Sequence, residues 1–296
     1  MSALKKQILV ILGNGFDLDI GLKTSYKDFW KEKESELITF CFEINPSVKL
    51  NPPLTIYHQK EVANHWFDFE EIMRRYASKT ETRNESQYEK LSRVASYQGS
   101  SLEGNKKYFE HLKQSLIKYL LIQQDNHPNS QSQAALLLRK INQKCLFHRY
   151  ICYNFNYTDI NIFAKQLGYR SNIEVKHIHG NLKERNIIFG VGEDSLYNGY
   201  EFLLKKNQGA KEVSFQEELL KADEVIIFGL AFGRNDIHYF IDFFKNIQNG
   251  LNRPIITIYT YNEQEKENIK HRLAEHNIDL SILMSMKILK MISTND

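Results

Sequence analysis

The chain has 296 residues, of which 42% are hydrophobic and 25% are charged, and this balance excludes a disordered chain. The formal net charge of +3 does not imply the concentrated basic face that binding to a phosphate backbone requires, so we expect no nucleic-acid partner. Three cysteines without a C-x-x-C pair exclude a disulfide framework and a cysteine-rich zinc module, and we expect no metal.

No apolar run approaches the roughly 18 to 20 residues that a membrane-spanning helix needs. The run nearest the N-terminus, Ile8–Leu12, is short, and no small-residue cleavage site follows it. We therefore expect a cytoplasmic protein without a membrane partner.

Short apolar runs rich in Ile, Val, Phe and Tyr predict buried strands along the chain. They are continuous rather than alternating, as in a parallel sheet that helices cover on both faces. Helical patterns follow several of them, at Asp159–Leu167, Asp236–Ile247 and Glu263–His276. This alternation predicts an α/β fold with a doubly wound, mainly parallel sheet. The predicted strands are Ile8–Leu12, Tyr150–Asn154, Ile173–Ile178, Ile187–Val191, Glu224–Phe228 and Pro254–Tyr261.

A large helical insertion is predicted between the first strand and the rest of the sheet. Residues 31–145 contain apolar residues at helical spacing, around Trp66–Met73 and Tyr108–Leu120, and no convincing strand. The polar stretch Gln123–Gln133 predicts a loop. The α/β nucleotide-binding domain is thus expected to comprise residues 1–30 and 146–296.

The first strand leads into Gly13-Asn14-Gly15-Phe16-Asp17, a usual place for a phosphate-binding turn. Glycine lets main-chain N–H groups approach a pyrophosphate, and we expect those of Gly13–Phe16 to hold one. Leu18 replaces the third glycine of G-x-G-x-x-G and no P-loop lysine follows, which argues against ATP hydrolysis. A strand-to-helix turn that merely needs two glycines explains the same residues. Asp17 is a candidate for holding a ribose hydroxyl or for capping the next helix, and the sequence does not separate these roles.

Other predicted strands are also followed by Gly, Asn, His or acidic residues. Asn156 follows the second strand, His179-Gly180 the third, and Gly229 through Asp236 the strand at Glu224–Phe228. Ligands bind at this edge in open α/β sheets, so we expect these loops to converge on one pocket.

The opening segment strongly resembles the AbiH family of phage abortive-infection proteins. The resemblance runs from Gly13-Asn14-Gly15-Phe16-Asp17-Leu18 through Gly21–Phe29. Trp66–Glu70, Asn156-Tyr157-Thr158 and His179-Gly180 also fit that family.

The same loops, in the same order, remotely resemble those of the sirtuin family of NAD-consuming enzymes. Gly13 and Gly15 match the sirtuin glycine element, Asn156 its Thr-Gln-Asn asparagine, and His179-Gly180 its catalytic His-Gly. This resemblance implies that NAD is the ligand, that His179 is the general base, and that Asn156 orients a water or holds the ribose. The implied nucleotide-binding residues are Gly13, Asn14, Gly15, Phe16, Asp17, Gly180, Gly229 and Asp236, with Asp236 directed at the adenosine ribose or capping a helix.

The sequence departs from the sirtuin pattern in ways that bear on the reaction. Ala231 replaces a serine of the last glycine element, and Lys23 replaces a proline of the first. Only residues 181–188 separate Gly180 from Phe189, where sirtuins insert a zinc domain that helps bind acyl-lysine peptides. Protein deacylation is therefore not expected, whereas plain hydrolysis of NAD needs only the nucleotide pocket.

The segment Trp66–Glu70 has two interpretations that the sequence leaves open. Trp66 and Glu70 share a face if the segment is helical, which suits an aromatic anchor with solvated acids. The other interpretation places Asp68 or Glu70 at the mouth of the pocket as an acid.

Together the resemblances imply an antiphage protein that hydrolyses NAD to nicotinamide and ADP-ribose when infection triggers it. The alternative is a non-catalytic nucleotide-binding sensor that acts through a partner, and a nucleic-acid-directed effector is a weaker third hypothesis. The expected partners are NAD or a related nucleotide and a phage-encoded trigger or partner defence protein. Homo-oligomerisation stays open.

Overall fold

The computed structural model describes residues 5–44, 70, 73–74, 77, 102–170, 173–192, 196, 198–208, 215–251 and 253–295. The chain divides into two compact units. The sheet unit comprises residues 1–23, 122–184 and 211–296, and the helical unit comprises residues 24–121 and 185–210. Compared with the expected boundaries, residues 122–145 join the sheet unit, whereas residues 24–30 and 185–210 belong to the helical unit.

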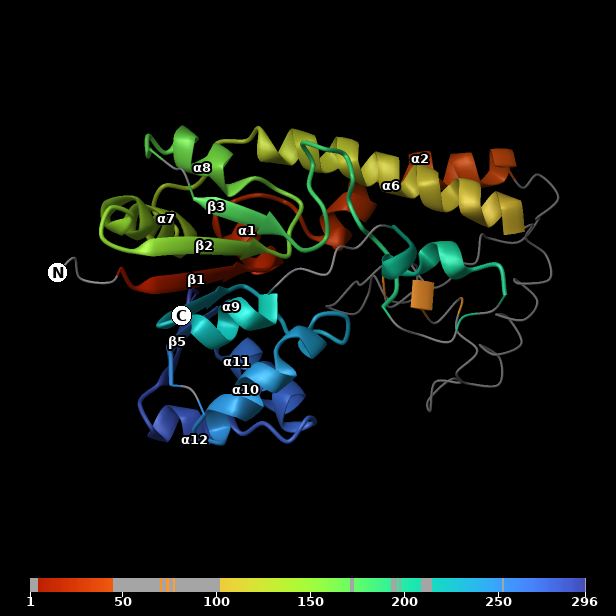
Figure 1. Ribbon diagram of the computed structural model, residues 1–296. Coiled ribbons are helices and arrows are strands. Elements are labelled where there is room, and N and C mark those ends of the chain that lie inside the picture. The colour runs from red at the N-terminus through yellow and green to blue at the C-terminus, as the bar shows by residue number, and fades with distance from the viewer. Residues whose placement is uncertain are drawn as a thin grey trace. The chain divides into compact units, whose positions relative to one another are not determined.

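The sheet unit is built on one parallel sheet, visible in Figure 1. Its six strands lie in the order β3-β2-β1-β4-β5-β6, and every neighbouring pair is parallel. The chain builds outward from β1 to β3, then returns to the other side of β1 and builds outward from β4 to β6. This order confirms the predicted doubly wound fold. The strands are β1 (Gln7–Leu12), β2 (Arg149–Asn154), β3 (Glu174–His177), β4 (Glu224–Phe228), β5 (Ile255–Thr260) and β6 (Leu289–Ser293).

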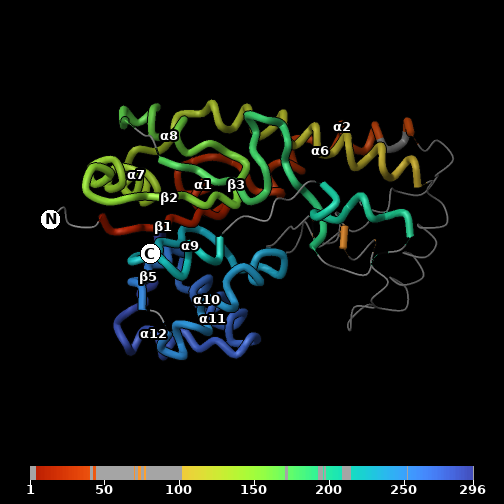
Figure 2. The backbone as a smooth tube through the Cα atoms, in the orientation of Figure 1, coloured from red at the N-terminus to blue at the C-terminus, as the bar shows by residue number. Residues whose placement is uncertain are grey.

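Helices cover both faces of the sheet, which explains why the strand sequences are apolar at consecutive positions. Successive residues of β1 alternate between two cores: Ile8 and Val10 join one, and Leu9 and Ile11 join the other. The first core is completed by α1 (Asn14–Asp19), α7 (Gln133–Lys144) and α8 (Ile160–Gln166). The second is completed by α9 (Phe215–Lys221), α10 (Ile241–Gln248), α11 (Glu263–Ala274) and α12 (Leu280–Ser285). Figure 2 shows α7 and α8 beside β2 and β3, with α10, α11 and α12 grouped on the other side of β1.

The helix boundaries follow from local hydrogen bonding. Asp159 caps α8 by accepting from the Asn161 N–H, and Asn262 caps α11 by accepting from the Glu265 N–H. The helix predicted over Asp236–Ile247 is divided into a 3₁₀ turn, η3 (Ile237–Tyr239), and α10.

One predicted strand was wrong, and one strand was missed. The run Ile187–Val191 lies in the helical unit and forms no strand; Val191 makes only an isolated bridge to Leu204. The Gln208 side chain binds both the N–H and the carbonyl of Phe189, as a neighbouring strand would. β6 was missed because it is an edge strand, and its mixed sequence Leu-Lys-Met-Ile-Ser is only partly buried.

The helical unit contains α2 (Tyr26–Ile44), most of α6 (Leu102–Gln124), and the 3₁₀ turns η1 (Glu201–Leu203) and η2 (Lys205–Gln208). The predicted helix around Tyr108–Leu120 is confirmed by α6, which buries Leu112 and Leu116. Trp66 and Asp68 lie outside the described residues.

Candidate functional site

The predicted site residues of the sheet unit lie in the segments that follow β1, β2, β3 and β4, and those after β1 are Gly13 and the first residues of α1. In a parallel sheet these segments all emerge at the carboxyl edge. β1 and β4 are neighbours in the sheet but belong to the two halves of the winding order. Their junction is the topological switch point, where open α/β sheets place their ligands.

The two glycines after β1 are required by the contact with the loop after β4. A Cβ atom on Gly13 would lie 2.6 Å from the Gly229 carbonyl oxygen, and one on Gly15 would lie 2.6 Å from the Gly229 Cα. A Cβ on Gly229 would in turn lie 2.4 Å from the Gly15 backbone, and Gly229 has a φ of +63°. Backbone therefore packs directly on backbone at the switch point, and no side chain fits between the two loops.

The same contact occupies main-chain N–H groups that were expected to hold a pyrophosphate. The N–H of Gly13 donates to the Phe228 carbonyl, that of Gly15 to the Gly229 carbonyl and that of Phe16 to the Gly13 carbonyl, each at 2.9 Å. In this conformation these three groups do not face a ligand. Phe16 is buried and packs edge-on against Phe228, whereas Asn14 is exposed at the start of α1.

Asp17 lies in a buried polar cluster that joins the loops after β1 and β2. Both carboxyl oxygens accept from the Thr158 hydroxyl, at 3.0 and 2.8 Å. Burial raises the pKa of Asp17 to about 7, although hydrogen bonds from Thr158 and Asn156 favour the charged form. Because Asp17 is only 1% exposed, it does not contact a ribose in this conformation.

Asn156 belongs to the same cluster. Its Nδ2 donates to the Gly13 carbonyl at 2.9 Å, and the side chain is 8% exposed. The Asn154 side chain holds the loop from the other end, since its Oδ1 accepts from the Asn156 N–H and its Nδ2 donates to the Thr158 carbonyl. The arrangement ties the first two loops of the edge together.

His179 and Asp236 form a second polar pair at this edge. The His179 Nε2 lies 3.1 Å from the Asp236 Oδ1, and the imidazole packs edge-on against Phe155. His179 is 7% exposed. The pair connects the loop after β3 with the loop after β4, across the ends of β2 and β1. A carboxylate on one imidazole nitrogen fixes the tautomer and leaves the other nitrogen as a base, as general-base catalysis requires.

The residues on either side of the His179 position, His177 and Gly180, have roles in the local structure. Gly180 has a φ of 75°, a left-handed conformation that favours glycine at the turn after His179. The Nδ1 of His177 lies 3.2 Å from the Asn156 carbonyl oxygen, and burial lowers the pKa of His177, which favours the neutral ring.

The structure thus brings the predicted residues into two clusters at one edge rather than into one. Asp17 and Asn156 lie beside the core that contains Phe16, whereas His179 packs on Phe155 of the opposite core. The bonds that organise both clusters were missed. From the sequence, Thr158 was noted only as part of a family motif. Asn154 could have been recognised because it is a polar residue at the end of an otherwise apolar strand.

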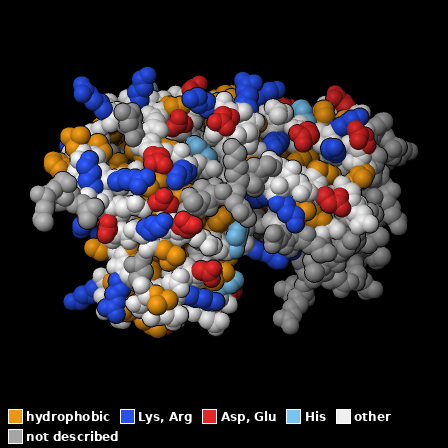
Figure 3. Space-filling model, viewed as in Figure 1, with side chains coloured by type: hydrophobic (Ala, Val, Ile, Leu, Met, Phe, Trp, Pro, Cys, Tyr) orange, Lys and Arg blue, Asp and Glu red, His pale blue; other side chains and the backbone are white. Residues whose placement is uncertain are grey.

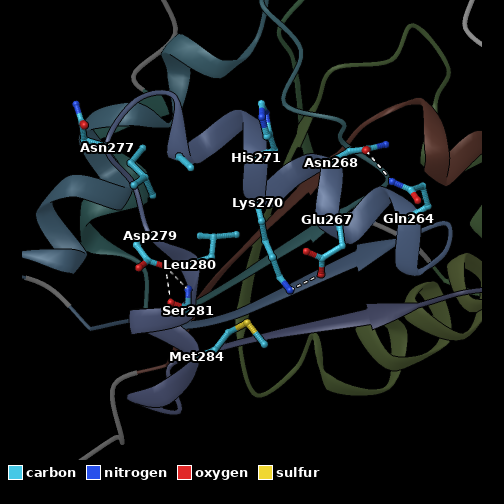
Figure 4. A pocket seen from close by; sticks show the side chains of 12 residues that line it. Gln264, Glu267, Asn268, Lys270, His271, Asn277, Asp279, Leu280, Ser281 and Met284 are labelled. Atoms are coloured by element: carbon cyan, nitrogen blue, oxygen red, sulfur yellow. Dashed lines mark hydrogen bonds and ion pairs between the residues drawn. The ribbon is translucent and has the colours of Figure 1, made fainter.

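A shallow groove of about 970 Å³ lies elsewhere on the sheet unit, along α11 and α12. Figure 4 shows that its polar side chains pair with one another, as Lys270 does with Glu267 and Ser281 with Asp279. It contains none of the predicted site residues. We therefore assign the candidate site to the carboxyl edge, where the chemistry-bearing side chains lie.

Glu70 has a structural environment within the helical unit. Its Oε1 lies 3.0 Å from the Lys205 Nζ and accepts from the Gly190 N–H at 3.3 Å. Glu70 is 8% exposed. This burial fits neither of the two interpretations of the sequence, a solvated acid or an acid at the mouth of the pocket. Its carboxylate is a buried ion-pair partner.

The described residues contain no cluster of three or more His, Cys, Asp or Glu side chains arranged to hold a metal ion. In that same part of the chain, every helix is too short or too polar to cross a bilayer.

No curated protein matches the sequence. The model of the bacteriophage abortive infection AbiH family matches residues 9–259, which include both clusters, all of β2, β3 and β4, and most of β1 and β5. The chain therefore belongs to the AbiH family, and this membership supports a role in phage abortive infection.

Proposed function

We propose that this AbiH protein acts in abortive infection by hydrolysing NAD to nicotinamide and ADP-ribose at the carboxyl edge of its sheet. The observation that carries the proposal is the His179–Asp236 pair, with its Nε2–Oδ1 distance of 3.1 Å, beside the switch point of a doubly wound sheet. An imidazole held by a carboxylate next to a nucleotide-binding position suits removal of a proton from water.

In the proposed reaction the bond between nicotinamide and ribose C1′ breaks, and neutral nicotinamide leaves. The ribose carries positive charge in the transition state, and water adds to C1′. With Nε2–H donating to an ionised Asp236, Nδ1 of His179 accepts the proton that the water loses. Asn156 acts by holding the loops after β1 and β2 in place through the Gly13 carbonyl.

Nicotinamide release by purified protein, with and without phage lysate, tests this proposal. His179→Ala and Asp236→Asn are expected to lower the turnover number by at least about a hundredfold, as loss of a general base or its partner does. His271→Ala is the matched control, because that imidazole is 78% exposed and lies on α11. The proposal fails if wild type consumes no NAD under any trigger, or if both site variants retain full activity.

A second candidate function is a nucleotide sensor without turnover, acting through a partner. It is favoured by the 7% exposure of His179, because a buried imidazole has little access to the water that hydrolysis requires. In calorimetry with NAD or ADP-ribose, this candidate predicts binding and recovery of unchanged ligand. Nucleotide profiles of infected cells that express wild type or His179→Ala separate the two functions, since only the enzyme depletes NAD.

A further inference from the structure

The most exposed large hydrophobic side chains among the described residues lie at the amino edge of the sheet, opposite the candidate site. Leu146, Leu251 and Phe147 are 76%, 75% and 69% exposed. Leu146 and Phe147 lie in the turn between α7 and β2, and Leu251 lies in the loop between α10 and β5. Leaving such side chains in water is costly, so their grouping at one edge indicates an interaction surface.

The two loops belong to one surface because the strands that follow them start at the same level of the sheet. Tyr150 of β2 and Glu224 of β4 both pair with Ile8 of β1, and Glu224 pairs with Ile255 of β5. Three strand spacings of about 4.8 Å separate β2 from β5, so the starts of these two strands are roughly 14 Å apart. Ile255, at the start of β5, adds a further aliphatic side chain that is 52% exposed.

Basic residues are interspersed among these apolar side chains. Exposed lysines and arginines precede or begin four of the strands, β1, β2, β5 and β6: Lys5, Lys6, Lys144, Arg149, Arg253 and Lys287. Two acids of this edge already have cationic partners, since Glu174 lies 3.6 Å from Arg149 and Glu224 lies 3.7 Å from Lys140. Figure 3 shows hydrophobic side chains near the N-terminus, over α7 and the turn into β2, beside Lys and Arg side chains. The edge is therefore both apolar and positively charged.

We propose that this amino edge docks on the surface of an anionic lipid bilayer, with Leu146, Phe147 and Leu251 entering the headgroup region. Lysine and arginine beside the apolar side chains complement the negative charge of the lipid headgroups. A protein interface instead excludes charge from its apolar centre and requires a complementary shape, whereas a fluid bilayer accommodates separate protruding loops. Aliphatic tips such as Leu146 and Leu251 have no stacking role on a nucleic acid. Surface docking of this kind requires no spanning helix.

The proposed orientation directs the candidate site away from the lipid. The His179–Asp236 pair lies at the carboxyl ends of the same strands, and β1 with six residues is about 20 Å long. The site would thus remain open to soluble ligands while the protein is bound. The docking surface does not depend on what the site does.

Co-flotation of the full chain with vesicles tests the proposal. Vesicles of phosphatidylcholine with 30 to 40% phosphatidylglycerol, roughly the charge of an anionic membrane, are expected to bind wild type at low salt, and pure phosphatidylcholine at least about tenfold less. The triple variant Leu146→Ser/Phe147→Ser/Leu251→Ser is expected to lose at least about tenfold in binding, because three inserted side chains are removed. Tyr261→Ser is the matched control, since this 63% exposed side chain follows β5 at the opposite edge and its loss should leave binding unchanged.

A second variant reports insertion directly. In Phe147→Trp, the indole emission is expected to shift to the blue on vesicle binding and to be quenched by brominated lipid. The proposal is overturned if wild type binds neither kind of vesicle, if the triple variant binds as wild type does, or if the indole stays in water. Equally tight binding to DNA or RNA, competing with vesicles and retained by the triple variant, would instead assign the edge to a nucleic acid.

Discussion

At the scale of single residues, Asp17 is the group whose chemistry differs most from its role in the sequence motif. The motif suggests a carboxylate that holds a ribose hydroxyl or caps the next helix, whereas the structure buries it against Thr158 and Asn156. A folded-state pKa of about 7 means that folding retains a proton which the unfolded chain loses near pH 4. The stability that this proton provides is full below pH 4 and is lost as the pH rises to 7.

Asp17→Asn is therefore expected to become progressively more stable than wild type as the pH rises. The difference in free energy of unfolding should grow by roughly 1.4 kcal/mol per pH unit between pH 5 and pH 7 and then level off. Denaturant unfolding at pH 5, 6, 7 and 8 measures it. Asp125→Asn, an exposed acid, should show no such trend. A pH-independent difference for Asp17→Asn would show that the carboxyl group is already charged at pH 5.

At the scale of elements, the contact between the loops after β1 and β4 sets the geometry of the carboxyl edge. Gly15 does not have a positive φ, so glycine is needed there for space rather than for conformation. Gly233, in the same loop as Gly229, offers a matched comparison because a Cβ at that position meets nothing within 4 Å.

Gly15→Ala is expected to destabilise the protein by about 1 to 3 kcal/mol, since the added methyl group overlaps the backbone at Gly229. Gly233→Ala should change stability by less than about 0.5 kcal/mol. Thermal or denaturant unfolding of both variants measures the difference. Equal stabilities would mean that the two loops separate at little cost.

The elements also show which features of the fold could be predicted from the sequence and which could not. Five predicted strands and the parallel winding were correct, because continuous apolar runs are local features. The Gly, Asn and His residues that follow the strands lie at one edge of the sheet, but in two clusters rather than in the single pocket that was expected. The strand predicted over Ile187–Val191 has the same local pattern, but its backbone partner is the Gln208 side chain. The His179–Asp236 pair joins residues 57 positions apart, and only the strand order brings them together. Local sequence patterns therefore identified His179 and Asp236 as candidates but could not show that the two side chains are in contact.

At the scale of the whole molecule, the sheet unit is assembled from three separate stretches of chain. β1 pairs with β2 on one side and with β4 on the other, and 211 residues, 13–223, lie between the end of β1 at Leu12 and the start of β4 at Glu224. Such pairing is non-local, so the centre of the sheet closes only when the last third of the chain is present.

A fragment that ends at residue 210 is accordingly expected not to form the sheet unit. Without β4, the backbone edge of β1 and the apolar side chains of Leu9 and Ile11 lose their cover. Circular dichroism and sedimentation should show an aggregated or unfolded fragment, in contrast to the full chain. A monomeric fragment with a cooperative unfolding transition would contradict this.

The crossing of backbone at Gly13, Gly15 and Gly229 has a consequence for how such chains are compared. Two glycines after the first strand are imposed there by steric demand, whatever the protein binds. If His179 and Asp236 act as proposed, relatives that have lost the activity would keep these glycines but would no longer need the imidazole and the carboxylate. Retention of His179 and Asp236 together, rather than of the glycines, would then distinguish active relatives from inactive ones.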